Sequence, residues 1–213
     1  KTPGVEAKPI KQISGSANFN EVFFNDVRIP DSQRLGAEGD GWKVALTTLM
    51  NERLAVGDPP GLDFDQIFEA TKEIEVEDGL AIKNSEVRQK MADWYVQSRG
   101  LQYTKYRSMT ALSKGQTPGP ELSISKLVTA SKMQEVSSYA LDLMDMAGYV
   151  HHDKNPVMRN LFQNGYFFSA AMRIAGGTDE VLRNIIAERV LGLPQDERPD
   201  KKVPFNELPS GKN

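Results

Sequence analysis

A glutamate and an arginine stand next to each other at Glu52 and Arg53, in a segment whose apolar spacing predicts a helix. A carboxylate acts as a general base most readily in an apolar cavity, which raises its pKa toward the working pH. A Glu-Arg pair on a helix is more often simply solvated. The neighbours here leave little room for a broad polar face, and they are Leu49, Met50, Leu54, Ala55 and Val56. These apolar neighbours favour the placement of Glu52 or Arg53 in a cavity.

A second candidate site is the run Thr178-Asp179-Glu180, which follows two glycines at 176 and 177. Thr178 is a typical helix cap, and the two acids would lie at the positive end of the helix. The N–H groups at a helix N-terminus suit phosphate or ribose oxygens. A plain helix cap is the alternative interpretation, and capping is part of the role in either case.

Several other chemistries are excluded. The chain has no cysteine, so disulfides, thiol nucleophiles and zinc-thiolate sites are ruled out, and the adjacent His151 and His152 fit a loop better than a metal site. Its 26 Lys+Arg residues are balanced by 29 Asp+Glu without a long basic block, which argues against nucleic-acid binding. No apolar run approaches the roughly 18–20 residues of a membrane span, and the first residues lack a signal-peptide pattern. We expect a soluble, cytoplasmic protein.

The elements that must position these residues change in type along the chain. Residues 19–24 and 27–29 predict two strands around a tight turn at Asn25-Asp26. Two or three strands are not stable alone, so they require a partner sheet from outside this chain.

The rest is helical, which predicts a mainly α, up-down bundle of four to six helices. One helix is expected around Trp42 to Met50 and a shorter one from Phe64 to Ile74, after a break at 58–61. Longer helices are expected from Asn84 to Gly115 and from Leu122 to Gly148, on either side of a loop at 118–120. The last two run from Asn155-Pro156 to the double glycine and from Thr178 to Gly192.

Two long segments carry a family resemblance. NFNEVFFNDVRIPDSQRLGAEGDGWKVALTTLMNERLAVG at 18–57 and RIAGGTDEVLRNIIAERVLGLP at 173–194 resemble acyl-CoA dehydrogenases. The resemblance implies FAD-dependent α,β-dehydrogenation of an acyl-CoA thioester: a carboxylate removes the α-proton, the β-hydride goes to the flavin, and electrons pass to an electron-transfer flavoprotein. It also implies dimers or tetramers. The implied layout is terminal strands of a middle β-domain (1–35), a C-terminal bundle (36–194) and a tail (195–213).

The resemblance also assigns roles to the candidate residues. Most members carry the catalytic glutamate in the loop before the last helix, where this chain has Gly176. A minority carry it on the first bundle helix, directly before an arginine, and Glu52-Arg53 matches that pattern. Glu52 is therefore the expected base and Arg53 the expected substrate-binding residue. Thr178, Asp179 and Glu180 match the segment that contacts the adenosine part of FAD.

Two segments depart from the family pattern. Where the family has an arginine-rich stretch near the flavin phosphates, residues 73–79 read Glu-Ile-Glu-Val-Glu-Asp-Gly, and acids there would repel phosphate. Residues 142–146 replace a glutamine- and glycine-rich turn that packs on a neighbouring subunit's flavin. Either the alignment shifts at 73–79, or the flavin site is altered or lost in this subunit.

The resemblance starts at the last strands of the β-domain, so we expect an incomplete subunit that is inactive alone. The alternative is a flavin-free, non-catalytic helical partner or assembly subunit of a heteromeric acyl-CoA dehydrogenase. The length and branching of the acyl chain are not specified by these residues.

Overall fold

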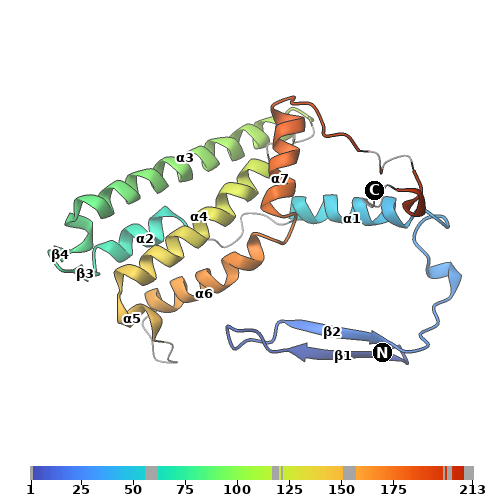
Figure 1. Ribbon diagram of the computed structural model, residues 1–213, viewed down its shortest axis with the longest axis horizontal. Coiled ribbons are helices and arrows are strands. Elements are labelled where there is room, and N and C mark those ends of the chain that lie inside the picture. The colour runs from blue at the N-terminus through green and yellow to red at the C-terminus, as the bar shows by residue number, and fades with distance from the viewer. Residues whose placement is uncertain are drawn as a thin grey trace, which may run out of the picture.

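The computed structural model describes residues 2–55, 62–116, 120, 122–150, 157–198, 200 and 203–208, with the backbone alone at 50–55, 122 and 157–159. Helices dominate these residues, and their strands form two short hairpins (Figure 1). The prediction of a mainly α, up-down bundle is confirmed. Four of the expected features lie outside the described residues: the break at 58–61, the loop at 118–119, the histidines at 151–152 and the helix start at 155–156.

The first hairpin pairs β1 (Val5–Ile10) with β2 (Phe19–Phe24), in a register that runs from Val5 opposite Phe24 to Ile10 opposite Phe19. The predicted second strand at 27–29 is wrong. The Asn25 N–H donates to the Gly4 carbonyl at 2.8 Å and closes the ladder, and Asp26 then turns the chain away with a φ of 51°. Every residue of both strands is exposed, so the hairpin has no core beneath it among the described residues.

Helix α1 (Gly41–Ala55) forms as predicted, and most of its described apolar side chains are exposed. Trp42 is 75% exposed, and Leu46 and Leu49 are 42% and 48% exposed. In Figure 1, α1 and the hairpin lie to one side of the bundle. These three side chains are therefore uncovered by the described part of this chain.

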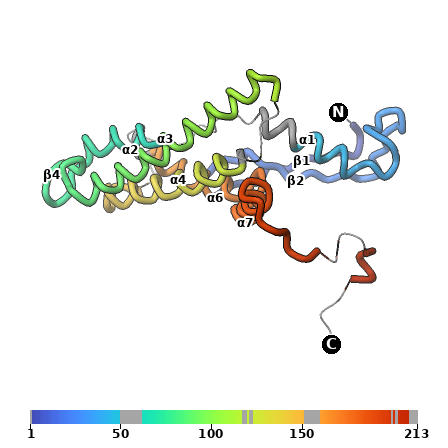
Figure 2. Tube along the Cα trace, turned by 90° about the horizontal axis from the view of Figure 1, so that it is seen from above, coloured from blue at the N-terminus to red at the C-terminus, as the bar shows by residue number. Residues whose placement is uncertain are grey.

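The bundle is built from α2 (Phe64–Thr71), α3 (Ser85–Ser113), α4 (Leu122–Leu143), α6 (Val157–Met172) and α7 (Asp179–Ile185). Both views show α4 beside α6, with α2 and α3 on the other side of α4 and α7 crossing near one end (Figures 1 and 2). The core lies where α2, α3, α4 and α6 meet and includes the buried Ile67, Met91, Trp94, Val136 and Phe162. The predicted start of α3 at Asn84 is confirmed, and Asn84 caps the helix, because its Oδ1 accepts from the N–H groups of Glu86 and Val87.

Helix α4 ends at Leu143, earlier than the predicted Gly148. Asp145 has a φ of 48°, which interrupts the helix before the short α5 (Met146–Tyr149). Gly148 folds back onto the end of α4, where a Cβ would overlap the Leu141 carbonyl oxygen. Glycine is needed at 148 for this close approach.

The acidic run after α2 forms the second hairpin, from β3 (Glu75–Val76) and β4 (Gly79–Leu80). Short helical turns among the described residues include η1 (Asp31–Gln33), η2 (Ala81–Lys83), the π-helical η3 (Ile186–Val190) that continues α7, and η5 (Phe205–Glu207). Across the described residues, no helix is both long and apolar enough to cross a membrane.

Candidate functional site

Glu52 and Arg53 lie in the last turn of α1 (Gly41–Ala55), so the helix expected beneath them is present. Their side chains lie outside the described residues. The described apolar side chains one to two turns earlier on α1, Leu46 and Leu49, are exposed.

The predicted cofactor-binding trio is brought together in one turn, where its members have different surroundings. Thr178 caps α7, since its hydroxyl accepts from the Val181 N–H at 3.4 Å and its carbonyl from the Leu182 N–H at 2.9 Å. Glu180 is exposed, and hydrogen bonds from its own N–H and from Thr178 lower the pKa of its carboxyl. Asp179 is buried at 2% exposure.

Asp179 is held by cations that the sequence did not single out. Arg173 Nε donates to its Oδ2 at 2.6 Å, and Lys126 Nζ lies 4.0 Å from its Oδ1. Arg173 also donates to Gln134 Oε1 at 2.7 Å, and Lys126 to the Gly177 carbonyl at 2.6 Å. Desolvation lowers the pKa of Lys126, an effect that Asp179 opposes and Arg173 reinforces. This cluster ties the turn before α7 to α4 and to the end of α6.

Gly176 has a φ of +70°, and a Cβ built on it would meet no atom within 4 Å. The position where the resemblance expects the usual glutamate is therefore spacious, although a side chain there must adopt a left-handed backbone conformation. Position 176 lacks a base because the residue there is glycine, and not because other atoms fill the space.

The two departures from the family pattern are visible in the structure. The acids of residues 73–79 are all exposed around the β3–β4 hairpin: Glu73, Glu75, Glu77 and Asp78. In the other segment, Asp142 Oδ1 accepts from the Tyr149 hydroxyl at 2.7 Å, a bond that raises the pKa of Tyr149. These residues do not supply the positive charge that flavin phosphates would need.

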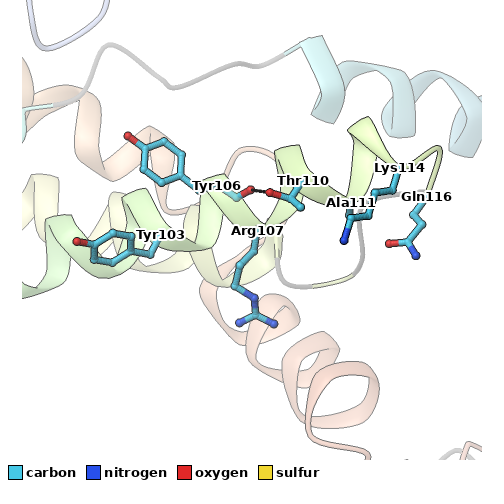
Figure 3. Close-up of a pocket in the computed structure, with 7 residues that line it drawn as sticks. All are labelled: Tyr103, Tyr106, Arg107, Thr110, Ala111, Lys114 and Gln116. Carbon is cyan, nitrogen blue, oxygen red and sulfur yellow. Dashed lines mark hydrogen bonds between the residues drawn. The ribbon is translucent and has the colours of Figure 1, made fainter.

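Two of the hollows on the described part of the bundle involve α3. An open depression of about 450 Å³ follows the C-terminal half of α3, and Figure 3 shows its lining residues along that helix and the turn after it: Tyr103, Tyr106, Arg107, Thr110, Ala111, Lys114 and Gln116. A second hollow of about 370 Å³ lies between α2, α3 and α4 and contains Asp63, Ser98 and Lys132. Sequence reasoning missed Lys132, since a lone lysine in a helix gives no sign of burial. The described residues contain no cluster of three or more potential metal ligands.

The bundle and the capped last helix define a helical domain of the kind found at the C-terminal end of acyl-CoA dehydrogenases. Residues 39–191 match the family model described as the acyl-CoA dehydrogenase C-terminal domain. The chain therefore belongs to the acyl-CoA dehydrogenase family, as the two sequence segments indicated.

Curated relatives support the same assignment. The acyl-CoA dehydrogenase IpdE1 of Mycolicibacterium smegmatis is 36% identical over 198 residues, which are 91% of this chain and 47% of that protein. The acyl-CoA dehydrogenase FadE34 of Mycobacterium tuberculosis is 30% identical over 196 residues, or 91% of this chain and 26% of that protein. The chain thus spans less than half the length of these relatives.

Solved structures share the fold. The ChsE4-ChsE5 complex of Mycobacterium tuberculosis matches with a TM-score of 0.73 and 19% identity, covering 92% of this chain and 52% of that chain. The steroid acyl-CoA dehydrogenase Tcur3481-Tcur3483 matches with a TM-score of 0.72 and 18% identity, covering 92% and 50%. Identities this low show that the fold is shared, but they say nothing about the residues of the site.

Proposed function

We propose that this chain supplies the catalytic base for FAD-dependent α,β-dehydrogenation of an acyl-CoA thioester. Family membership supports the reaction class. The observation that carries the specific role is a pair of positions: glycine at 176, where most members have the base, and Glu52 directly before Arg53 on α1. Each position alone is weak evidence, and together they match one minority pattern within the family.

In this function the Glu52 carboxylate accepts the proton α to the thioester carbonyl. The base needs the thioester within about 3 Å and shielded from water. Arg53 would bind the acyl-CoA beside the base. FAD, the cofactor of this family, would supply the acceptor for the β-hydrogen and its electron pair, and an electron-transfer flavoprotein would be the next carrier.

The described residues of this chain do not fit the phosphates of FAD by themselves. The exposed acids at 73–78 would repel them, and Asp179 is turned into the bundle toward Arg173. Thr178 and Glu180 remain candidates for the adenosine part. The phosphate-binding groups must then come from the rest of the subunit or from another subunit.

A second function is favoured by the same acidic hairpin: a flavin-free, non-catalytic partner or assembly subunit of a heteromeric acyl-CoA dehydrogenase. The ChsE4-ChsE5 structure, one chain of which shares this fold, is a complex of two named components, which makes a hetero-oligomer a reasonable arrangement to test. One flavin bound per copy of this chain in the complete enzyme would argue for the first function, and a flavin bound only by the other subunit would argue for the second.

The substrate is proposed only as a class. One structural neighbour is a steroid acyl-CoA dehydrogenase, so a steroid-derived acyl-CoA is the first substrate to compare with straight-chain acyl-CoA thioesters.

The deciding experiment replaces Glu52 by Gln in the complete enzyme. We expect turnover to fall by at least about 10³-fold while flavin content and substrate binding are retained, as for the loss of a positioned base. Glu38→Gln, at an exposed glutamate before α1, is the matched control and should leave turnover unchanged. Turnover of the Glu52 variant within tenfold of the parent would overturn the assignment.

A further inference from the structure

We infer that the outer side of α3 is an interface at which two copies of this chain pair in antiparallel orientation about Gly100. The pairing goes beyond the proposed function and is independent of the role of Glu52. We refer to this side of the helix as the α3 stripe, and it consists of Glu86, Gln89, Asp93, Val96, Gly100, Tyr103, Arg107, Thr110 and Lys114.

The α3 stripe has the spacing of a surface that pairs with another helix. Its members follow one another at alternating intervals of three and four residues, and every one of them is exposed. An average interval of about 3.5 residues is the repeat with which two helices pack along their length. Residues 86–114 extend over about 42 Å at about 1.5 Å per residue, which is long enough for such a contact.

The stripe lies on the side of α3 that faces away from the bundle. The buried residues of α3 are Val87, Met91, Trp94 and Ser108. Each of them is followed two residues later by a member of the stripe, which is a rotation of about 200° around the helix. Val96 is accordingly 69% exposed. The packing of the bundle therefore leaves the stripe uncovered in the described part of the chain.

Gly100 lies at the centre of the stripe. Glycine inside a helix is destabilising relative to alanine, and a Cβ at position 100 would meet no atom within 4 Å. Packing within the described part of the chain thus gives no reason for a glycine. A second helix that crosses here does give one, because the missing side chain lets two backbones approach closely. Val96 and Tyr103, which flank Gly100, supply apolar surface at 69% and 62% exposure.

The charges of the stripe are ordered symmetrically about Gly100. Asp93 and Arg107 each lie seven residues from it, and Glu86 and Lys114 each lie fourteen residues from it. In an antiparallel pair with its two-fold axis at Gly100, Asp93 faces Arg107 of the second copy. Glu86 likewise faces Lys114 of the second copy, and each contact occurs twice by symmetry. A parallel pair would set like charges opposite one another, so the charge order selects the antiparallel orientation.

The same polarity extends beyond the stripe. The acids at 73–78 are all exposed, and Figure 1 shows their β3–β4 hairpin at the N-terminal end of α3. Towards the other end, residues 99–116 carry cations and no acid, and these are Arg99, Lys105, Arg107 and Lys114. Four members of the stripe border the open depression there (Figure 3). Antiparallel pairing brings the acidic end of each copy beside the basic end of the other, so a second copy fits this surface.

Charge reversal in the full chain tests the pairing. All chains carry Phe24→Lys, so that the exposed β1–β2 hairpin does not contribute to association. Asp93→Arg should weaken self-association by at least about tenfold in sedimentation equilibrium, because two attractive contacts become repulsive. Lys90→Glu reverses a charge at an exposed position of α3 outside the stripe. It is the matched control and should leave self-association unchanged.

Mixing two variants identifies the contact. Arg107→Asp alone should weaken self-association as Asp93→Arg does. An equimolar mixture of the two variants should associate as well as the chain with neither change, because both pairs in the mixed dimer then join opposite charges. Self-association of Asp93→Arg as strong as that of Lys90→Glu, or a mixture no stronger than its components, would overturn the inference. A stripe that instead binds a different subunit would give one of these results.

Distances between copies test the orientation. The chain has no cysteine, so Lys90→Cys and Ser85→Cys can each carry one spin label per copy at an exposed position outside the stripe. Each residue of separation from the axis at Gly100 adds two helical rises, or about 3 Å, to the distance between the labels. Double electron–electron resonance should therefore give about 30 Å for Lys90→Cys and about 45 Å for Ser85→Cys. Equal distances at the two positions would contradict the antiparallel pairing.

Discussion

Arg173 and Asp179 form an ion pair across the turn that joins α6 to α7, with the guanidinium Nε 2.6 Å from the carboxylate Oδ2. The side chain of Asp179 is 3% exposed and that of Arg173 is 41% exposed. The carboxylate thus points into the bundle, and a direct contact with a cofactor would require it to leave Arg173. The geometry favours Asp179 as the residue that holds the turn and leaves Thr178 and Glu180 as the members of the trio nearer to solvent.

Replacing Asp179 by Ala should destabilise the bundle by about 2 kcal/mol, the usual scale for losing buried hydrogen bonds to a charged group. Urea unfolding followed by circular dichroism measures the change. Glu180→Ala, at the exposed neighbouring acid, should leave the unfolding midpoint nearly unchanged. Equal effects of the two substitutions would contradict the structural role of Asp179.

Moving the base to position 176 should restore part of the activity lost in Glu52→Gln. A glutamate at 176 meets open space, at the cost of roughly 1–2 kcal/mol for a left-handed backbone conformation. The variant Glu52→Gln with Gly176→Glu should therefore turn over faster than Glu52→Gln alone, with an altered acyl-chain preference. If the double variant is no faster, the two positions do not face the same substrate carbons.

The stability of the bundle should depend on Asp63 in acid. Burial raises the pKa of this carboxyl, but hydrogen bonds from Lys132, Ser98 and the Phe64 N–H outweigh that effect and hold the pKa below the ordinary value of 3.8. A lowered pKa in the folded state gives stability that is present above pH 3.8 and is lost as the pH falls through the folded-state pKa.

Asp63→Asn tests this dependence, because asparagine caps a helix about as well as aspartate. The free energy of unfolding should be lower than that of the parent at neutral pH, and the difference should narrow as the pH falls below 3.8. Urea titrations over that range provide the measurement. A difference that stays constant from neutral pH into acid would show that the charge of Asp63 contributes nothing.

Flavin binding by the isolated chain should be weak, because exposed acids surround the β3–β4 hairpin. Titration with FAD should show no saturable binding at micromolar concentrations. Glu75→Arg should strengthen whatever binding exists, whereas Glu38→Arg, far away in sequence, should not. A tightly held, stoichiometric FAD in the parent chain would mean that residues 73–79 do not face the flavin phosphates.

The isolated chain should self-associate through the β1–β2 hairpin, whose apolar residues are exposed on both faces. Phe24→Lys, at a residue 69% exposed, should increase the monomer fraction in sedimentation velocity without changing the helical content. Phe205→Lys, at a residue 91% exposed outside the hairpin, is the control and should have little effect. A parent chain that is monomeric at every concentration tested would contradict this role of the hairpin.

The sequence by itself determined the features that depend on neighbouring residues. Asn84 and Thr178 were predictable as caps because a cap bonds to N–H groups two or three residues further on. The helical spacing of apolar residues and the family resemblance likewise depend on residues that are close together in the chain. The expected bounds of α3 were correct to within two residues at Gly115.

Only the tertiary structure decided which distant residues meet. Strand β2 pairs with β1 and not with residues 27–29, because the ladder closes between Gly4 and Asn25. Asp179 turns inward because Arg173 and Lys126 are brought beside it by the packing of three helices. Lys132 is buried because Asp63, 69 positions earlier in the chain, supplies its counter-charge. Spacing along a sequence predicts local hydrogen bonds, but burial and charge pairing depend on how the helices pack, which no local pattern records.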